Sequence, residues 1–517
     1  MSHFEELLGV LLAAVLLAAL ARRIGAPYPA FLALVGAVLA FLPGTPKFSI
    51  DPSVALALFV APVLLDAAYD ASPRDLRDNW VAVGSLAVVS VLLTTIAVAV
   101  VVRSLVPAIP WAAAIALGAI VSPPDAAAAI AVLRQLRPPH RILTILQGES
   151  LLNDASALLI YRLAVGAIAM SAFSVRTVAP TILLVVVGSV LAGPLLARVT
   201  LWLTQKIEDV PTAIIIQFAS TFGVWILADR IGLSSILTMV SYAIAVSRQA
   251  PARTPARIRL PSYAVWETAV FVLNVLAFVF IGLQIRPTLS SLDPEDRTRY
   301  LEVSGAVLLT VILVRIAWVM THNTIARWQI RKFGFHPRRP TDPPTIGSGI
   351  AISWAGMRGI VTLAAALALP EAFPFRDLIV LTAFAVVFGT LVLQGLTLKP
   401  LLRVLQLRDD DPVGREVAIA RDQALEAALA TLGTEGSAPA EAVRQELIAH
   451  LAHPSGESAE SEERGPSHED IHRRALAAAR RVAFDMRARD DIGDDAFHRL
   501  EEEFDWLEMG SRAGEGG

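Results

Sequence analysis

The sequence predicts an all-α polytopic membrane protein with about 13 transmembrane helices, two of them discontinuous, followed by a helical C-terminal tail. Composition is the first reason: the 517 residues are 55% hydrophobic and only 18% charged, whereas soluble domains carry about 25% charged residues. The second reason is that the apolar residues gather in long runs, and a membrane-spanning helix needs roughly 20 of them. The third is an uneven distribution of charge along the chain.

Thirteen apolar segments before residue 408 are long enough, or nearly long enough, to span a bilayer. The second, third and ninth are short, and the fifth and twelfth contain helix-breaking residues. Interruptions at matching places in two halves of a chain are typical of transporters built from inverted repeats. The segments centre near 7–21, 28–42, 54–68, 81–102, 111–133, 142–169, 178–203, 212–228, 233–246, 265–285, 301–320, 347–369 and 378–398.

Positive charge is shared unequally between alternate loops. One set of loops carries 17 Lys and Arg residues and the other set carries 8. Because basic loops remain in the cytoplasm, the asymmetry predicts that the N-terminus lies outside and that the tail lies in the cytoplasm. The first apolar stretch has no basic segment before it, so we expect a retained span rather than a cleaved signal peptide.

We divide the chain into a transmembrane unit, residues 1–407, and an acidic helical tail, residues 408–517. From Asp409 onward there are 26 Asp and Glu residues against 12 Arg, a net charge of −14, while the preceding part has a net charge of +11. The tail should contain helices at 415–432 and 438–451 and a helical hairpin at 470–509 that turns near Asp491. It can dock on the basic loops and regulate transport. Its five histidines are either pH sensors or ordinary surface residues.

Charged residues within the apolar segments are the candidates for chemistry. An Asp at the middle of a bilayer costs about 2.5–3.5 kcal/mol even on a lenient scale, so such residues persist where they bind an ion, carry a proton or pair with each other. The absence of cysteine excludes thiolate chemistry and Cys-ligated metals. The candidates are Asp66, Asp125, Glu149, Asp154, Arg162, Arg315 and Arg358.

The fifth segment contains the run Ser122-Pro-Pro-Asp125. Pro123 and Pro124 remove two backbone donors and should break the helix. Transporters bind ions at such breaks, where backbone carbonyls are freed. Asp125 is therefore a candidate ligand, and it can also act as the N-cap of the second half-helix.

The sixth segment carries four oxygen-bearing side chains within six positions: Glu149, Ser150, Asn153 and Asp154. At 100° per residue they fall on two adjacent stripes of one helix. Hard oxygen ligands suit a small alkali cation. Polar residues at the start of a helix would account for Glu149 and Ser150, but not for Asp154, which lies about a turn and a half deeper.

The twelfth segment mirrors the fifth. Gly356 and Gly359 loosen the helix on either side of Arg358, whose charge is permanent. Arg315 lies in the middle of the eleventh segment and needs an anion. A pair with Glu149 would satisfy both charges, whereas snorkelling of Arg315 to the interface is the alternative.

With these motifs in view, the sequence resembles the cation:proton antiporter 1 family, the sodium/hydrogen exchanger group, in its bacterial branch. The resemblance covers residues 7–407 and continues more weakly into the tail. The Glu-Ser-x-x-Asn-Asp run at 149–154 is its most specific part. The other matching segments are 59–66, 122–125, the Tyr161-Arg162 pair, 273–282 and 354–359.

The resemblance implies a role for each matching residue. Asp154 looks like the carboxylate that binds cation and proton in turn, and Asp125 and Ser150 look like accessory Na⁺ ligands, helped by carbonyls around Pro123 and Pro124. Asn153 matches the Asn of electroneutral exchangers, Glu149 and Arg315 match a stabilising ion pair, and Arg358 matches the basic residue of the second crossover.

Two positions depart from the family pattern. Pro124 stands where relatives often have a threonine, so one hydroxyl ligand is missing. Asp66 stands where many have Glu, and its shorter side chain either reaches the site or lies at the end of a helix.

The sequence therefore predicts a secondary transporter that exchanges Na⁺, with Li⁺ or K⁺ as alternatives, for H⁺ across the cytoplasmic membrane. Exchange would be electroneutral, one for one. The resemblance implies that spans four to six and eleven to thirteen rock against a scaffold. The resemblance also implies a homodimer. We expect no cofactor, no enzymatic activity and no nucleic-acid partner.

A K⁺/H⁺ antiporter, a cation channel and a proton-coupled solute carrier are the alternative functions. A membrane enzyme using Ser150 lacks a nearby histidine, since His322 lies near the end of a span.

Overall fold

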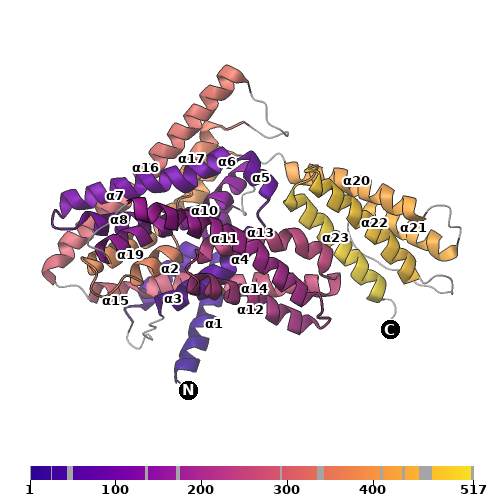
Figure 1. The fold of residues 1–517 in the computed structure, drawn as a ribbon, viewed down its shortest axis with the longest axis horizontal. Coiled ribbons are helices and arrows are strands. Elements are labelled where there is room, and N and C mark those ends of the chain that lie inside the picture. The colour runs from indigo at the N-terminus through magenta and orange to yellow at the C-terminus, as the bar shows by residue number, and fades with distance from the viewer. Residues whose placement is uncertain are drawn as a thin grey trace.

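The computed structural model describes residues 2–24, 26–42, 51–133, 138–169, 175–290, 294–334, 343–407, 411–432, 437–452 and 468–513, and within these ranges it contains helices and no strand. The helices form a large body, α1 to α19, and a smaller lobe, α20 to α23, that lies against one end of it (Figure 1). The all-helical fold class is confirmed.

The body begins with helices that include two π-helical segments, η1 and η2. Their bounds are α1 (Ser2–Arg23), α2 (Tyr28–Leu39), α3 (Pro52–Ala55), η1 (Leu56–Val60), α4 (Ala61–Tyr69), α5 (Pro73–Asp78), α6 (Trp80–Gly84), η2 (Ser85–Ser90) and α7 (Val91–Leu105). The rest of the body comprises α8 (Trp111–Val121), α9 (Ala126–Leu133), α10 (His140–Ala169), α11 (Val175–Thr204), α12 (Val210–Arg230), α13 (Ser235–Arg253), α14 (Ala256–Leu283), α15 (Ile285–Ser290), α16 (Pro294–Phe333), α17 (Ile346–Trp354), α18 (Ile360–Leu367) and α19 (Arg376–Leu405).

Each of the thirteen apolar segments is helical. In the described part of the chain, seven helices are long and apolar enough to cross a membrane, and three further apolar helices are shorter. The fifth and twelfth segments are each split, into α8 and α9 and into α17 and α18. The number of 13 spans and the orientation of the termini stay predictions.

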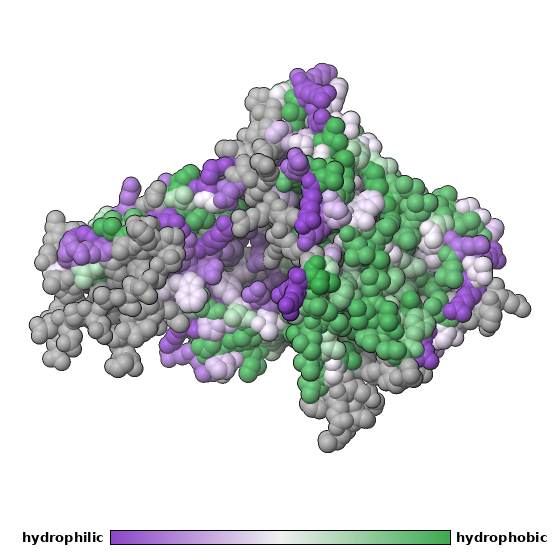
Figure 2. Space-filling view, turned by 180° about the vertical axis from the view of Figure 1, so that it is seen from behind, coloured by the Kyte–Doolittle hydropathy of each residue, from purple (hydrophilic) through white to green (hydrophobic). Residues whose placement is uncertain are grey.

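The helices of the body differ in how much of their surface is covered. α19 is largely buried, whereas α11 is mostly exposed. The exposed side of α11 carries leucines that are more than half exposed, and Figure 2 shows a broad hydrophobic surface over the body. The leucines are Leu183, Leu184, Leu191 and Leu195. An apolar surface of this extent suits contact with lipid.

Helices α2 and α14 pack closely because each has a glycine at the contact. A Cβ atom on Gly36 would lie 2.7 Å from the carbonyl oxygen of Val279, and one on Gly282 would lie 2.6 Å from the backbone nitrogen of Ala37. Small residues that let two backbones approach are a common basis of helix association in membranes.

The C-terminal lobe has a hydrophobic core of its own. It comprises α20 (Pro412–Leu432), α21 (Ala438–Ala452), α22 (His468–Ala488) and α23 (Asp494–Ala513). Their buried faces meet in one cluster that includes Phe497, Leu500 and Phe504. The expected hairpin is present, and it turns at residues 489–493.

The acidic lobe docks on arginines of the body. Arg74 donates to both carboxylate oxygens of Glu416 at 2.8 Å, and Arg77 pairs with Asp490 at 2.5 Å. Hydrophilic residues gather at this junction in Figure 2. The contact has the charge complementarity that the −14 tail and the +11 preceding part predict.

A second docking contact is buried. Arg259 of α14 pairs with Glu501 at 2.8 Å and with Asp505, and all three side chains are at most 5% exposed. Burial raises the pKa of Asp505, although Arg259 and Arg480 beside it act in the opposite direction. Desolvation therefore offsets much of the attraction, as is general for buried ion pairs.

We predict that Gly282→Ala destabilises the protein, because the new methyl group would collide with the backbone of α2. Overpacking of this kind costs about 1–3 kcal/mol, which a thermal unfolding curve of the purified protein will show as a lower Tm. Gly223→Ala is the matched control, since a Cβ atom there has no neighbour within 4 Å. Equal Tm values for the two variants would contradict the close packing of α2 and α14.

Candidate functional site

Two interrupted helices meet at their breaks in the middle of the body. Between α8 and α9 the chain is non-helical at Pro123, Pro124 and Asp125. Between α17 and α18 it is non-helical at residues 355–359. The backbone N–H of Asp125 donates to the carbonyl oxygen of Met357 at 2.7 Å, so the two breaks are joined directly.

Arg358 caps the first break. The last carbonyls of a helix have no partner within that helix, and here the end of α8 is buried. Arg358, 1% exposed, donates from Nε to the carbonyl oxygen of Val121 at 3.1 Å and from Nη2 to that of Ser122 at 3.3 Å. Its charge also suits the negative end of the helix dipole.

Arg315 caps the second break in the same way. It donates from Nη2 to the carbonyl oxygen of Ile352 at 3.0 Å and from Nε to that of Ser353 at 3.2 Å, near the end of α17. Its remaining donors form a bidentate pair with Glu149 of α10, at 2.5 and 3.0 Å. Arg315 therefore pairs with an anion inside the body and does not snorkel.

The second break needs glycine at positions 356 and 359, because side chains from other helices approach its backbone closely there. A Cβ atom on Gly356 would overlap the side chain of Arg315, and one on Gly359 would overlap the carboxylate of Asp125. These two glycines thus allow a charged side chain from another helix to reach the backbone of the break.

Asn153 fixes the first break to α10. It is fully buried, and its Nδ2 donates to the carbonyl oxygen of Pro124 at 2.8 Å. An ionised Asp at this position has no donor for that carbonyl. The Oδ1 atom of Asn153 is buried and has no hydrogen-bond partner among the described residues.

Asp125 closes the N-terminal end of α9. Its Oδ1 accepts a hydrogen bond from the backbone N–H of Ala127 at 2.8 Å, as an N-cap does. The sequence left open whether this residue is an N-cap or a site residue, and its position supports both readings because the capped helix begins at the break.

A cavity of about 540 Å³ reaches these elements, and Asp125, Ser150 and Asp154 line it together. Asp154 is 8% exposed and forms no hydrogen bond or ion pair with another residue in the described ranges. It is close enough to Asp125 for the two charges to interact. The cavity thus contains one buried carboxylate that is not engaged by the protein itself.

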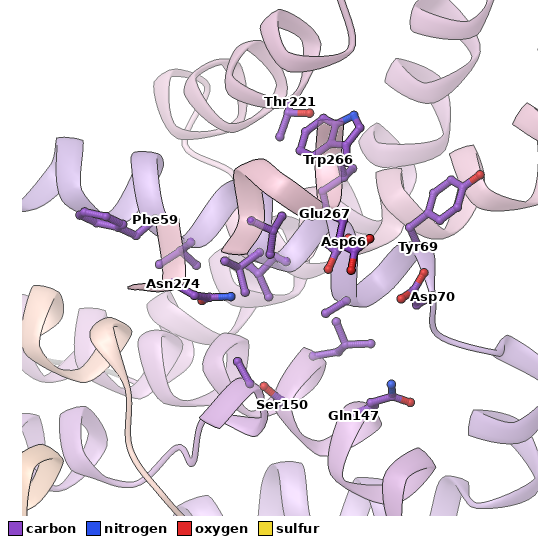
Figure 3. A pocket seen from close by; sticks show the side chains of 18 of the residues that line it. Phe59, Asp66, Tyr69, Asp70, Gln147, Ser150, Thr221, Trp266, Glu267 and Asn274 are labelled. Carbon is purple, nitrogen blue, oxygen red and sulfur yellow. The ribbon is translucent and has the colours of Figure 1, made fainter. Parts of the chain in front are cut away.

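The walls of the cavity carry further polar side chains (Figure 3). Asp66 and Asp70 come from α4 and its end, Glu267 and Asn274 from α14, and Gln147 from α10 near Ser150. Asp66 therefore lines the same cavity as Asp154. The cavity extends from the two breaks toward the lobe, because Tyr69 and Arg259 also line it.

Helix α23 of the lobe contacts two residues that line this end of the cavity, Tyr69 and Arg259. The ring of His498 stacks on that of Tyr69 with 5.5 Å between centroids, and Asp505 binds Arg259. The hydroxyl groups of Tyr69 and Tyr263 lie 3.3 Å apart beside them.

Arg162 lies outside the set of residues that surround the helix breaks and the cavity. Its side chain is 53% exposed and faces Asp229 at 3.5 Å, and it does not line the cavity. Pro124 contributes through its backbone carbonyl, which Asn153 occupies.

Sequence reasoning gave no role to Glu267 or Asn274. The signal for Glu267 is an acidic residue within the apolar segment at 265–285, which is the same signal that identified the other candidates. Asn274 lies inside a matching motif, but nothing in the sequence placed it opposite Ser150 across a cavity.

The fold and the site define a class: a multi-helix membrane transporter with charged groups at paired helix breaks. Residues 10–404 match the family model described as the transmembrane sodium/hydrogen exchanger. The chain belongs to this family, whose members are transporters and not enzymes.

Relatives cover most of the chain. An uncharacterised Na⁺/H⁺ exchanger of Mycobacterium tuberculosis is 31% identical over 82% of this chain and 78% of its own length. The sodium, potassium, lithium and rubidium/H⁺ antiporter of Bacillus subtilis is 31% identical over 72% of this chain and 57% of its own length. The low-affinity Na⁺/H⁺ antiporter NhaS1 of Synechocystis is 28% identical over 83% of this chain and 80% of its own length.

A solved structure has a similar fold. The sodium proton antiporter MjNhaP1 of Methanocaldococcus jannaschii at pH 8 aligns with a TM-score of 0.59 and 16% identity, over 78% of this chain and 100% of its own. At that identity the match describes the fold alone, and it agrees with the helical body observed here.

We predict that Glu149→Gln lowers the free energy of unfolding by about 3–5 kcal/mol, because it leaves the charge of Arg315 buried without an anion. Asp229→Asn removes an exposed ion pair and should cost less than about 1 kcal/mol. Thermal unfolding of the purified proteins distinguishes these outcomes. The double variant Glu149→Gln/Arg315→Met should recover only part of the loss, because the carbonyls of Ile352 and Ser353 then lose their donor. A Glu149→Gln variant as stable as Asp229→Asn would show that the buried pair is not needed.

Proposed function

We propose that this protein exchanges Na⁺ for H⁺ across the cytoplasmic membrane, with Asp154 as the carboxylate that binds cation and proton in turn. Li⁺ and K⁺ are alternative cations, as the name of the Bacillus subtilis relative suggests. The observation that carries the proposal is the unengaged carboxylate of Asp154 in a cavity that reaches two joined helix breaks.

The proposed Na⁺ ligands are Asp154, Asp125 and Ser150, with the free Oδ1 of Asn153 as an additional oxygen. All are hard oxygen donors, which suit alkali cations. The carbonyl of Pro124 and the carboxylate of Asp66 are secondary candidates. Pro124 is engaged by Asn153, and Asp66 lines the same cavity as Asp154.

Competition for one carboxylate couples the two ions. Burial opposes the empty, charged form of Asp154, whereas a proton or a cation neutralises it. Carrying the empty site through an apolar barrier would cost at least the ~2.5–3.5 kcal/mol of an unpaired Asp at mid-membrane. The site therefore changes sides only when it is loaded, and each turnover exchanges one cation for one proton.

Asn153 supports electroneutral exchange. A second acid at this position would add a second titratable group, whereas the amide carries no charge and holds the break through Pro124. We extend the proposal to alternating access between a scaffold and a moving bundle, to 13 spans arranged as inverted repeats with crossing broken helices, and to a homodimer in the bilayer.

The tail, residues 408–517, is proposed to lie in the cytoplasm and to regulate transport. It rests on Arg74, Arg77 and Arg259, and these arginines belong to the more basic set of loops. Its helix α23 contacts Tyr69 and Arg259 at one end of the cavity, and this end would then be the cytoplasmic one.

We predict that Asp154→Asn abolishes cation-driven proton movement in proteoliposomes while the protein still folds and inserts. The amide can neither release a proton nor neutralise a cation. The measurement is the change of a pH-sensitive dye inside the vesicles after Na⁺, Li⁺ or K⁺ is added outside. Asp229→Asn, which alters an exposed carboxylate, should transport as the wild type does. Exchange retained by Asp154→Asn would exclude the proposed mechanism.

We also predict that the ion gradient reached at equilibrium does not depend on membrane potential. For a carrier that moves one net charge, 100 mV contributes about 2.3 kcal/mol, or roughly 45-fold in the gradient. Clamping proteoliposomes at 0 and −100 mV with potassium and valinomycin tests this, with Na⁺ as the exchanged cation. A 45-fold difference between the two potentials would refute one-for-one exchange, and large cation currents would indicate a channel.

A further inference from the structure

Three side chains from three separate elements converge where the lobe meets the body. Asp75 lies in α5, His140 begins α10, and Asp495 is in the first turn of α23. One ligand atom from each lies within 4.8 Å of the other two. The Nε2 atom of His140 is 3.2 Å from Oδ2 of Asp75 and 3.4 Å from Oδ2 of Asp495.

The nitrogen of His140 faces more oxygens than one N–H can serve. The hydroxyl of Thr144 lies 3.3 Å from the same Nε2 atom, in addition to the two carboxylates. Imidazole offers a single donor or a single acceptor at that position. One cation at the centre of the group would instead satisfy the nitrogen and both carboxylates together.

The two carboxylates are held in place by different parts of the protein. The other oxygen of Asp75 accepts from Nε of Arg74 at 3.1 Å, which directs Oδ2 toward His140. Among the described residues, His140 is the group within ion-pair distance of the Asp495 carboxylate. Docking of the lobe therefore brings a second carboxylate to His140, where Asp75 already lies between His140 and Arg74.

We propose that Asp75, His140 and Asp495 form a binding site for a divalent transition metal of the zinc type, which joins the lobe to the body. Zinc takes imidazole nitrogen and carboxylate oxygen at about 2.0–2.2 Å in tetrahedral geometry, which places neighbouring ligand atoms about 3.3–3.5 Å apart. The 3.2 and 3.4 Å separations around His140 match that spacing.

The ligand set also selects against the hard cations. Na⁺, Mg²⁺ and Ca²⁺ prefer sites made of oxygen alone, whereas imidazole suits zinc, nickel and copper. This site is separate from the transport site, which contains oxygen donors and no histidine. Two ligands belong to the body and the third to the lobe, so the complete site exists only when α23 is docked.

A metal at this position would hold the start of helix α23 against the body. Asp495 lies one helical turn before His498, and the ring of His498 stacks on Tyr69 at the end of the cavity. Metal bound at Asp495 holds this first turn of α23 against α5 and α10. The metal would thereby fix the helix that contacts Tyr69 at the end of the cavity.

The first experiment measures zinc on the full-length protein in detergent, with the affinity tag removed. After equilibrium dialysis against Zn²⁺, elemental analysis should find one tightly bound zinc per chain. His140→Gln and Asp495→Asn should each bind it more than about tenfold more weakly. Asp491→Asn is the matched control, because Asp491 is an exposed carboxylate of the same hairpin that pairs with Arg489.

The second experiment measures docking directly and does not depend on transport. The chain has no cysteine, so spin labels can be placed at the exposed positions Gln205 and Arg499 after substitution by Cys. Zn²⁺ should narrow the distance distribution between the labels in the wild-type background and leave it unchanged with Asp495→Asn.

Absence of stoichiometric zinc overturns the proposal and leaves a histidine that bridges two carboxylates as an ion pair. Zinc bound equally well by Asp495→Asn also overturns it, because the site would then lie elsewhere. A distance distribution that Zn²⁺ does not change in the wild-type background shows that the metal does not join the lobe to the body.

Discussion

The site depends on one constraint, which is that the carbonyl groups freed at two helix breaks must find donors inside an apolar body. An unsatisfied backbone group at membrane depth costs several kcal/mol. Arg358 satisfies the carbonyls at the end of α8, and Arg315 satisfies those near the end of α17. Each arginine is itself a buried charge, and for Arg315 the compensation is the bidentate pair with Glu149.

This arrangement assigns most of the charged groups at the two breaks to structure. Glu149 is occupied by Arg315, Asp125 caps α9, and the amide of Asn153 holds Pro124. Asp154 has no such partner in the described part of the chain, and it lines the cavity. The groups that fix the breaks thus leave Asp154 beside them in the cavity without a partner among the described residues, which is the arrangement on which the proposed function rests.

Much of this could be predicted from local sequence rules. Adjacent prolines break a helix wherever they occur, and the i, i+4 spacing of Glu149 and Asn153 places them on one stripe. The same rule shows that Arg162, nine residues after Asn153, lies on the opposite face of α10, where it is exposed. Partners across the fold were less predictable: no local rule assigns Arg358 to α8 or places Glu267 along the cavity wall, because these depend on how distant helices pack.

The ion pairs between the lobe and the body differ in their energetics from the hydrogen bonds that hold the two helix breaks. Burial raises the pKa of Asp505 and of Asp495, even though cationic groups lie beside each of them. In both cases desolvation opposes the local attraction, as is general for buried ion pairs. The breaks are held by hydrogen bonds that cannot be given up inside the body, whereas the lobe rests on charges that water can solvate when it separates. Charged side chains therefore serve two purposes in this fold: they hold the two helix breaks together, and they join the lobe to the body.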